Sequence, residues 1–182
     1  MADSITIWTI GHSSRNIEEF LETLADQSIR QVADVRRYPG SRLHPQFNQG
    51  NLEASLRKAG VGYRHFPGLG GRRTKRAEQS PNTAWRVEAF NAYADYMLTD
   101  EFQQALGEIA AVAREARTAI MCAEVLPWRC HRRLVADALL ARGWTVLDIL
   151  GVGSIRQHQL PEFAKVVEGR VTYPGETLFP DA

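Results

Sequence analysis

The chain has 182 residues, of which 44% are hydrophobic and 24% charged, so it is long and apolar enough for one globular domain with a sizeable core. Its formal net charge of +1 excludes strong overall attraction to nucleic acid or an anionic membrane, so polyanion binding would need a local patch. The first residues lack the features of a signal peptide, and no apolar run approaches the roughly 20 residues that span a bilayer. Two cysteines are too few for a disulfide framework. We therefore expect one soluble, cytoplasmic domain over residues 1–182.

Strand and helix signals alternate along the first half of the chain. The nearly continuous β-favouring run over residues 5–10 predicts a buried strand. Asn16, with Glu19 three residues later, has the spacing of a helix capping box, and apolar residues follow at helical period. Further elements are expected in this order: a strand over 32–35, a long loop over 37–49, a helix over about 51–59 and a strand over 62–66.

The second half repeats this alternation. Helices are expected near residues 87–97 and 102–113, then a strand from 118, a helix ending near 142, a strand over 144–150, a short edge strand over 155–158 and a less regular segment over 161–182. Strands that alternate with helices indicate an α/β domain with a mainly parallel sheet flanked by helices. In such sheets ligands bind outside the carboxyl ends of the strands, so we expect the site at that edge.

The stretch over residues 121–133 concentrates reactive side chains. The implied geometry is a strand that ends in Cys122 and Glu124, a short turn, and a helix that opens with Cys130, His131 and Arg132. Residues in the first turn of that helix would lie in the positive field of its N-terminus. We therefore centre the candidate site on this turn.

Polar side chains also follow the other predicted strands. His12 and Ser13 follow the first strand, Asp34 and Arg36 follow the second, and His65 follows the third. Because the carboxyl ends of parallel strands meet at one edge of the sheet, we expect these groups to form a polar pocket with the central turn.

The combined motifs resemble a known family. They are Thr9-Ile10-Gly11-His12-Ser13, Asp34-Val35-Arg36 with Pro39 and Ser41, Phe47-Asn48, Leu69-Gly70-Gly71, and Cys122-Ala123-Glu124 through Cys130-His131-Arg132. Together they resemble the bacterial and archaeal family labelled domain of unknown function 488, over about residues 6–160. The resemblance implies that the polar clusters belong to one recurring arrangement in one domain. It brings no established reaction, so function is argued from the residues.

The two cysteines have structural as well as chemical interpretations. Cys130 beside His131 is either a nucleophile with a lowered pKa or a small buried thiol. Cys122 lies on the strand and is expected to belong to the core. A redox pair is disfavoured by the absence of a C-x-x-C spacing and by a reducing compartment. Both cysteines with His131 and Glu124 match no common zinc spacing, so we predict no metal site, and no other pattern identifies a cofactor.

Glu124 is the candidate general acid or base, since a carboxylate at a strand end in a partly dry pocket can have a raised pKa. The alternative is a structural salt bridge with Arg36, Arg129 or Arg132. Asp34 with Arg36 offers the same choice, and there the structural pairing is favoured. His12 with Ser13 could donate to an anion, although their sequence lacks the lysine and glycine spacing of a P-loop.

Two arginine-rich loops are candidates for phosphate binding. They contain Arg36, Arg37, Arg42, Arg72, Arg73, Lys75 and Arg76, with Tyr38, Phe47 and Trp85 interleaved. Such residues can bind phosphate groups and stack a base, whereas solvated loop charge is the structural alternative. The sequence holds no helix-turn-helix, zinc-finger or RNP motif that would support specific nucleic-acid readout.

We interpret the chain as an enzyme that acts on an anionic, phosphate-bearing or nucleotide-like substrate by hydrolysis or group transfer. The candidate catalytic residues are Glu124, Cys130 and His131, and the candidate anion-binding residues are His12, Ser13, Asp34, Arg36, Ser41 and Arg132. The alternative is a non-catalytic nucleic-acid or nucleotide-binding module that uses the arginine loops. No membrane partner is expected, and no pattern indicates an oligomeric state.

Overall fold

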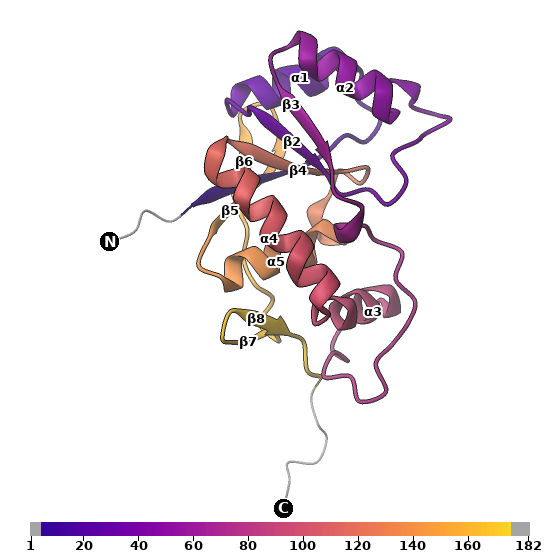
Figure 1. The fold of residues 1–182 in the computed structure, drawn as a ribbon, viewed down its shortest axis with the longest axis vertical. Helices are drawn as coiled ribbons and strands as arrows, with labels where there is room; N and C mark the ends of the chain where they lie inside the picture. The colour runs from indigo at the N-terminus through magenta and orange to yellow at the C-terminus, as the bar shows by residue number, and fades with distance from the viewer. Residues whose placement is uncertain (1–4, 176–182) are drawn as a thin grey trace, which may run out of the picture.

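A six-stranded sheet runs through the protein in the order β3-β2-β4-β1-β5-β6 (Figure 1). The computed structural model describes residues 5–175. The parallel strands are β1 (Thr6–Gly11), β2 (Gln31–Asp34), β3 (Gly62–His65), β4 (Thr118–Cys122) and β5 (Thr145–Gly151), and β6 (Ser154–Gln157) pairs antiparallel with β5 at the edge. The predicted α/β class with a mainly parallel sheet is confirmed.

Helices cover both faces of this sheet (Figure 1). On one face lie α1 (Ile17–Asp26) and α2 (Gln49–Lys58), and on the other lie α3 (Glu88–Met97), α4 (Asp100–Glu115) and α5 (Arg132–Ala141). The start of α1 is fixed as the sequence predicts, because the Asn16 side chain accepts a 2.8 Å hydrogen bond from the backbone N–H of Glu19. Two hydrophobic cores result, one on each face.

Alternation along the strands decides which side chains meet which helices. On β4, Ala119 and Met121 belong to the core beneath α1 and α2, whereas Ile120 and Cys122 belong to the core beneath α3, α4 and α5. The thiol at the end of β4 therefore points toward α5, which begins directly after the reactive turn. This orientation brings Cys122 to the residues that precede α5.

The order of the strands places a crevice at the end of β4. The chain leaves β1 and β2 through α1 and α2 on one face, but it leaves β4 through α5 on the other face. The adjacent strands β1 and β4 therefore continue into helices on opposite faces of the sheet. Such a divergence is the position where open α/β sheets bind ligands.

The C-terminal part contains a hairpin that the sequence did not indicate. Strands β7 (Lys165–Val167) and β8 (Arg170–Thr172) pair antiparallel, and Val171 and Tyr173 pack into the core that contains α5. The sequence predicted a less regular segment over 161–182, of which residues 176–182 lie outside the described residues. Within residues 5–175, no helix is long and apolar enough to cross a membrane.

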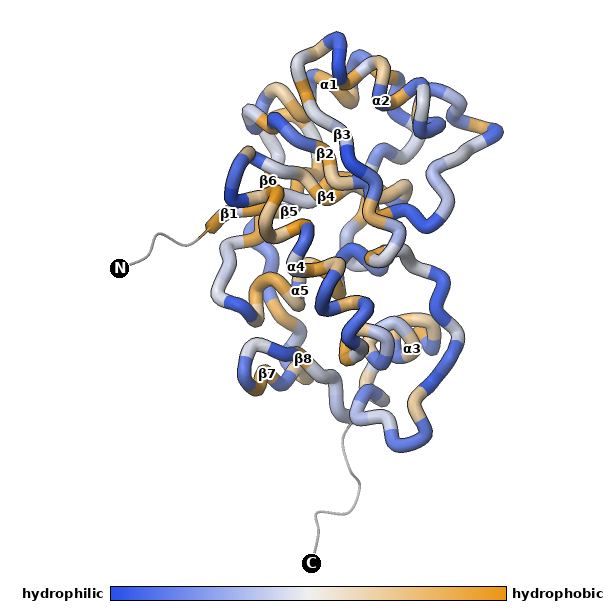
Figure 2. The backbone as a smooth tube through the Cα atoms, viewed as in Figure 1, coloured by the Kyte–Doolittle hydropathy of each residue, from blue (hydrophilic) through white to orange (hydrophobic). Residues whose placement is uncertain are grey.

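The predicted loops contain single helical turns that each begin with proline. These are η1 (Pro45–Phe47), η2 (Pro67–Leu69) and η3 (Pro127–Arg129). The turn η3 separates β4 from α5, so Cys130 follows η3 and α5 itself begins at Arg132. The loop that runs from η2 down to α3 is largely hydrophilic (Figure 2).

Candidate functional site

A pocket of about 570 Å³ lies at the carboxyl ends of β1, β2 and β4. Its walls come from residues 12–14 after β1, 36–38, 40, 41 and 44 after β2, 71 and 72 after η2, and 122–125 with His131. Main-chain hydrogen bonds continue the pairing of β1 and β4 beyond the sheet, from His12 N–H to the Cys122 carbonyl at 3.0 Å and from Ser13 N–H to the Ala123 carbonyl at 2.9 Å. The strand ends that form the pocket floor are therefore joined directly.

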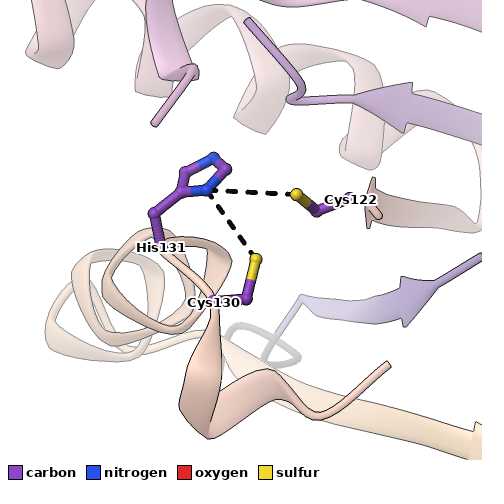
Figure 3. Close-up of side chains that lie close together, drawn as sticks. All are labelled: Cys122, Cys130 and His131. Carbon is purple, nitrogen blue, oxygen red and sulfur yellow. Dashed lines mark hydrogen bonds between the residues drawn. The ribbon is translucent and has the colours of Figure 1, made fainter. Parts of the chain in front are cut away.

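Cys122, Cys130 and His131 form a compact centre beside this pocket (Figure 3). The Nδ1 atom of His131 lies 4.0 Å from the Cys122 sulfur and 3.7 Å from the Cys130 sulfur. Both thiols are buried and free, but only Cys122 lines the pocket. The structure thus brings together three groups that the sequence placed in one turn. Cys122 is buried in the core, as expected, and it also lines the pocket.

The His131 ring is held in one orientation. Its Nε2 atom lies 3.1 Å from the Val35 carbonyl oxygen, which can only accept, so Nε2 carries a proton and Nδ1 is the ring nitrogen that faces the thiols. A hydrogen bond from the Cys130 thiol, with further help from His131, lowers the pKa of Cys122 despite its burial. As the donor in that hydrogen bond, and because it is buried, Cys130 has a raised pKa.

Arg36 is the innermost cation of the pocket and is held in place by Asp34. Its Nε and Nη2 atoms donate to the Asp34 carboxylate at 2.9 and 2.6 Å, and its Nη1 donates to the Phe47 carbonyl at 2.9 Å. Tyr63 donates a further hydrogen bond to Asp34 at 2.8 Å. Asp34 does not line the pocket. Of the two interpretations of this pair, the structural one is observed.

His12 lies between Arg36 and a phenyl ring. Its Nδ1 donates to the Ser13 carbonyl at 2.8 Å, its Nε2 accepts from Arg36 at 3.4 Å, and the ring stacks on Phe47 at 4.2 Å. Burial, assisted by the Arg36 charge, lowers the pKa of His12 to about 4. The side chain is therefore neutral at pH 7, and it lines the pocket as an acceptor for Arg36 rather than as a cation.

Glu124 and Arg132 occupy opposite sides of the loop after β4. Glu124 is exposed and lines the pocket, and its carboxylate accepts a 3.2 Å hydrogen bond from the Leu126 N–H. Arg132 is fully buried and donates to the carbonyl oxygens of Glu124 and Val125. Arg132 is absent from the pocket wall and holds the loop from behind.

The sequence profile of a family described as Domain of unknown function DUF488 matches residues 16–139. The chain belongs to the DUF488 family. The match contains Arg36, the arginine loops and the whole Cys122–Cys130–His131 centre, and it ends within α5. Comparisons with curated proteins and with solved structures find no match. The family assignment agrees with the resemblance drawn from the motifs.

The arginine loops of this DUF488 chain contribute to the pocket. Arg37, Tyr38 and Arg72, which belong to the predicted loops, line it beside Ser13 and Ser41, and so does His44, which was not among the predicted site residues. Arg37 donates to the Arg72 carbonyl at 3.4 Å, so the two arginine loops meet there. Their basic composition was a sequence signal, but which of their residues face the pocket depends on the loop conformation. His65 donates to the Arg36 carbonyl at 2.7 Å and lies outside the pocket wall.

A second buried polar cluster of the DUF488 chain lies away from the pocket. His158 contacts Asp148 on β5 at 3.0 Å and Asp137 on α5 at 2.7 Å. Thr9 donates to Asp148 at 2.6 Å, and Tyr173 donates to Asp137 at 2.7 Å. Burial lowers the pKa of His158, but the two carboxylates outweigh it and raise the value to about 9. This cluster is closed and fully hydrogen-bonded, so it joins α5 to the sheet rather than forming a site.

Proposed function

We propose that this protein is an enzyme that acts by hydrolysis or group transfer on an anionic, phosphate-bearing or nucleotide-like substrate. One observation carries the proposal: the buried Cys122–Cys130–His131 centre opens, through Cys122 and His131, into a pocket whose walls include three arginines. Reactive groups and anion-binding groups thus share one cavity. Its volume of about 570 Å³ is within the range that accommodates small ligands.

Arg37 and Arg72 are the best candidates to contact the anion. Both are exposed and line the pocket, whereas most donors of Arg36 are already used by Asp34, Phe47 and His12. Arginine donors suit phosphate because their planar fork matches two oxygens at once. Arg36 then contributes positive charge at the base of the pocket, and Asp34 acts as its positioning partner.

Glu124 remains the candidate acid or base, because its carboxylate is at the pocket wall and forms no ion pair among the described residues. Cys122 replaces Cys130 as the thiol that can reach a substrate, since only Cys122 lines the pocket. Both thiols must stay reduced for this chemistry. A cytoplasmic location would keep them so.

Chemical modification combined with ligand binding tests the proposal. In reduced, metal-free protein, iodoacetamide should modify Cys122 faster than Cys130, and inorganic phosphate or a nucleoside monophosphate should slow that reaction. An Arg37→Gln/Arg72→Gln variant should lose the protection while keeping the same thermal midpoint. Arg42→Gln is the matched control, because Arg42 is exposed in the same loop but does not line the pocket. If no phosphate-bearing compound protects Cys122, the proposal is wrong.

A second candidate function rests on a different observation. A further hollow of about 530 Å³ shares Arg37 and Arg72 with the first and continues over residues 73–77. Arg37, Arg72, Arg73 and Lys75 give the two hollows a shared basic wall, whereas Arg76 is paired with Asp95 and Glu88, and Glu101 also lines the second hollow. Such a basic wall suits a longer polyanion, as in a non-catalytic nucleic-acid-binding module. Binding of a single-stranded oligonucleotide by such a module should weaken steeply with salt and survive Glu124→Gln and Cys122→Ser. Dependence on Glu124 or Cys122 would favour the enzyme.

A further inference from the structure

The three atoms of the thiol–imidazole centre are spaced as metal ligands are. The Cys122 sulfur, the Cys130 sulfur and His131 Nδ1 all lie within 4.8 Å of one another, and the two sulfur–nitrogen distances are 4.0 and 3.7 Å. Bond lengths of about 2.3 Å to sulfur and 2.0–2.1 Å to nitrogen place neighbouring ligands of a tetrahedral zinc ion roughly 3.5–3.8 Å apart. The two sulfur–nitrogen distances therefore need to contract by a few tenths of an ångström, and the sulfur–sulfur distance, which is within 4.8 Å, by about 1 Å at most.

The contacts of His131 with the two thiols are long. One Nδ1 atom faces both sulfurs, at 4.0 and 3.7 Å, which are weak hydrogen-bond distances. A divalent cation would use Nδ1 and both sulfurs at once. Two thiolates would also neutralise the ion, which makes its burial acceptable.

The surroundings prepare His131 to be a ligand. The Val35 carbonyl accepts a hydrogen bond from Nε2–H, which is the outer-shell contact that usually orients a metal-binding histidine. The backbone of Gly71 lies against the His131 ring, where an added Cβ atom would be only 2.7 Å from Nδ1. Val35 and Gly71 thus restrict the ring, and Nδ1 faces both sulfurs (Figure 3).

We propose that Cys122, Cys130 and His131 bind one divalent transition-metal ion, with zinc the best match, and leave its fourth position open to the pocket. The two thiol protons pass to solvent when the ion binds. Three protein ligands with an open position are the arrangement of catalytic rather than structural zinc sites. This inference rests on the proposed function, because it names the cofactor of the same pocket and would give it a Lewis acid beside Glu124.

Cobalt substitution tests the site without any assay of activity. Reduced full-length protein, stripped with a chelator and titrated with Co²⁺, should show thiolate-to-cobalt charge-transfer and tetrahedral d–d absorption that saturate at one ion per chain. Zinc should displace the cobalt and raise the thermal midpoint. Cys122→Ser, Cys130→Ser and His131→Asn should each lose the tetrahedral spectrum. His44→Gln should keep it, because His44 lines the pocket outside the centre.

The wild-type spectrum decides the proposal even if a variant fails to fold. Absence of the charge-transfer band, with both thiols shown to be reduced by thiol titration, would overturn the metal site. A spectrum that survives His131→Asn in folded protein would do the same. If phosphate still protects Cys122 in metal-free protein that never binds cobalt, the metal site fails and the proposed function stands. If cobalt binds but no phosphate-bearing compound does, the proposed function fails and the metal site stands.

Discussion

Two buried clusters lie at α5, one through His131 at its N-cap and one through Asp137 within it, and they differ in how completely they are satisfied. In the closed cluster, His158 lies between two carboxylates, and each carboxylate accepts a further hydroxyl hydrogen bond. In the open cluster, two thiols share one nitrogen of His131, and Cys122 faces the pocket. A complete network stabilises a fold, whereas an incomplete one beside a cavity has capacity left for a ligand. Substitutions in the closed cluster should therefore mainly lower stability, and substitutions in the open cluster should mainly affect ligand binding.

The largest effect is expected from Asp137→Ala in the closed cluster. The substitution leaves the Tyr173 hydroxyl buried without its acceptor and leaves His158 with Asp148 as its one carboxylate, which should lower the free energy of unfolding by about 3–5 kcal/mol. Urea denaturation at pH 7 measures this. Glu108→Ala is the control, because its ion pair with Arg64 is exposed and should change stability by about 0–1 kcal/mol. Equal losses of unfolding free energy in Asp137→Ala and Glu108→Ala would contradict a special stabilising role of the closed cluster.

The next effect is the dependence of stability on pH. Folding raises the pKa of His158 from 6.5 to about 9, because the attraction of Asp137 and Asp148 outweighs burial. The protonated form is the one that folding favours, so this stabilisation is fully present below pH 6.5 and is lost as pH rises through 9. The loss should approach about 3 kcal/mol. Denaturation at several pH values should show the decline in the wild type and a flatter profile in His158→Gln.

A smaller effect should come from Gly71→Ala at the open cluster. The new methyl group would collide with His131 and displace its ring, at a cost of about 1–3 kcal/mol. Because the ring carries the Nδ1 ligand, the cobalt spectrum should be lost as well. Gly50→Ala is the matched control, since nothing lies within 4 Å of a Cβ at that helical position. Retention of the spectrum in Gly71→Ala would show that the ring can move without harm to the centre.

The smallest effect on stability, with the largest on activity, is expected from Glu124→Gln. Its carboxylate is exposed and accepts one backbone hydrogen bond, so the free energy of unfolding should change by less than about 0.5 kcal/mol. Turnover of a substrate found by screening should fall by roughly 10²–10⁴-fold, while phosphate still protects Cys122. A large loss of stability would instead make Glu124 a structural residue.

Local patterns were sufficient to predict most of the sheet and helices. The hairpin of β7 and β8 was missed because each strand has three residues and the turn is Glu168-Gly169 at positive φ, where Asn-Gly or Asp-Gly is the usual signal. The family and the α/β class followed from the motifs and from the alternation of elements, and both are confirmed.

The pocket was less predictable because it depends on long-range register. The Asp34–Arg36 pair is local in sequence, so the pairing could be anticipated. Cys122 ends β4, whereas Cys130 follows η3, and the sequence does not determine which of the two the folded turn places at the pocket wall. The contact between Arg37 and Arg72 joins two loops that only the folded sheet brings together.

The pocket combines a frame of buried and main-chain contacts with a wall of exposed loop side chains. Main-chain bonds between the ends of β1 and β4, and the buried Arg132, hold the frame without using any exposed side chain. Arg37, Tyr38 and Arg72 form the wall, and all three are exposed. For protein engineering, this division means that charge and shape at the entrance can be redesigned by loop substitutions alone. Libraries confined to these positions should retain the fold while sampling new ligands.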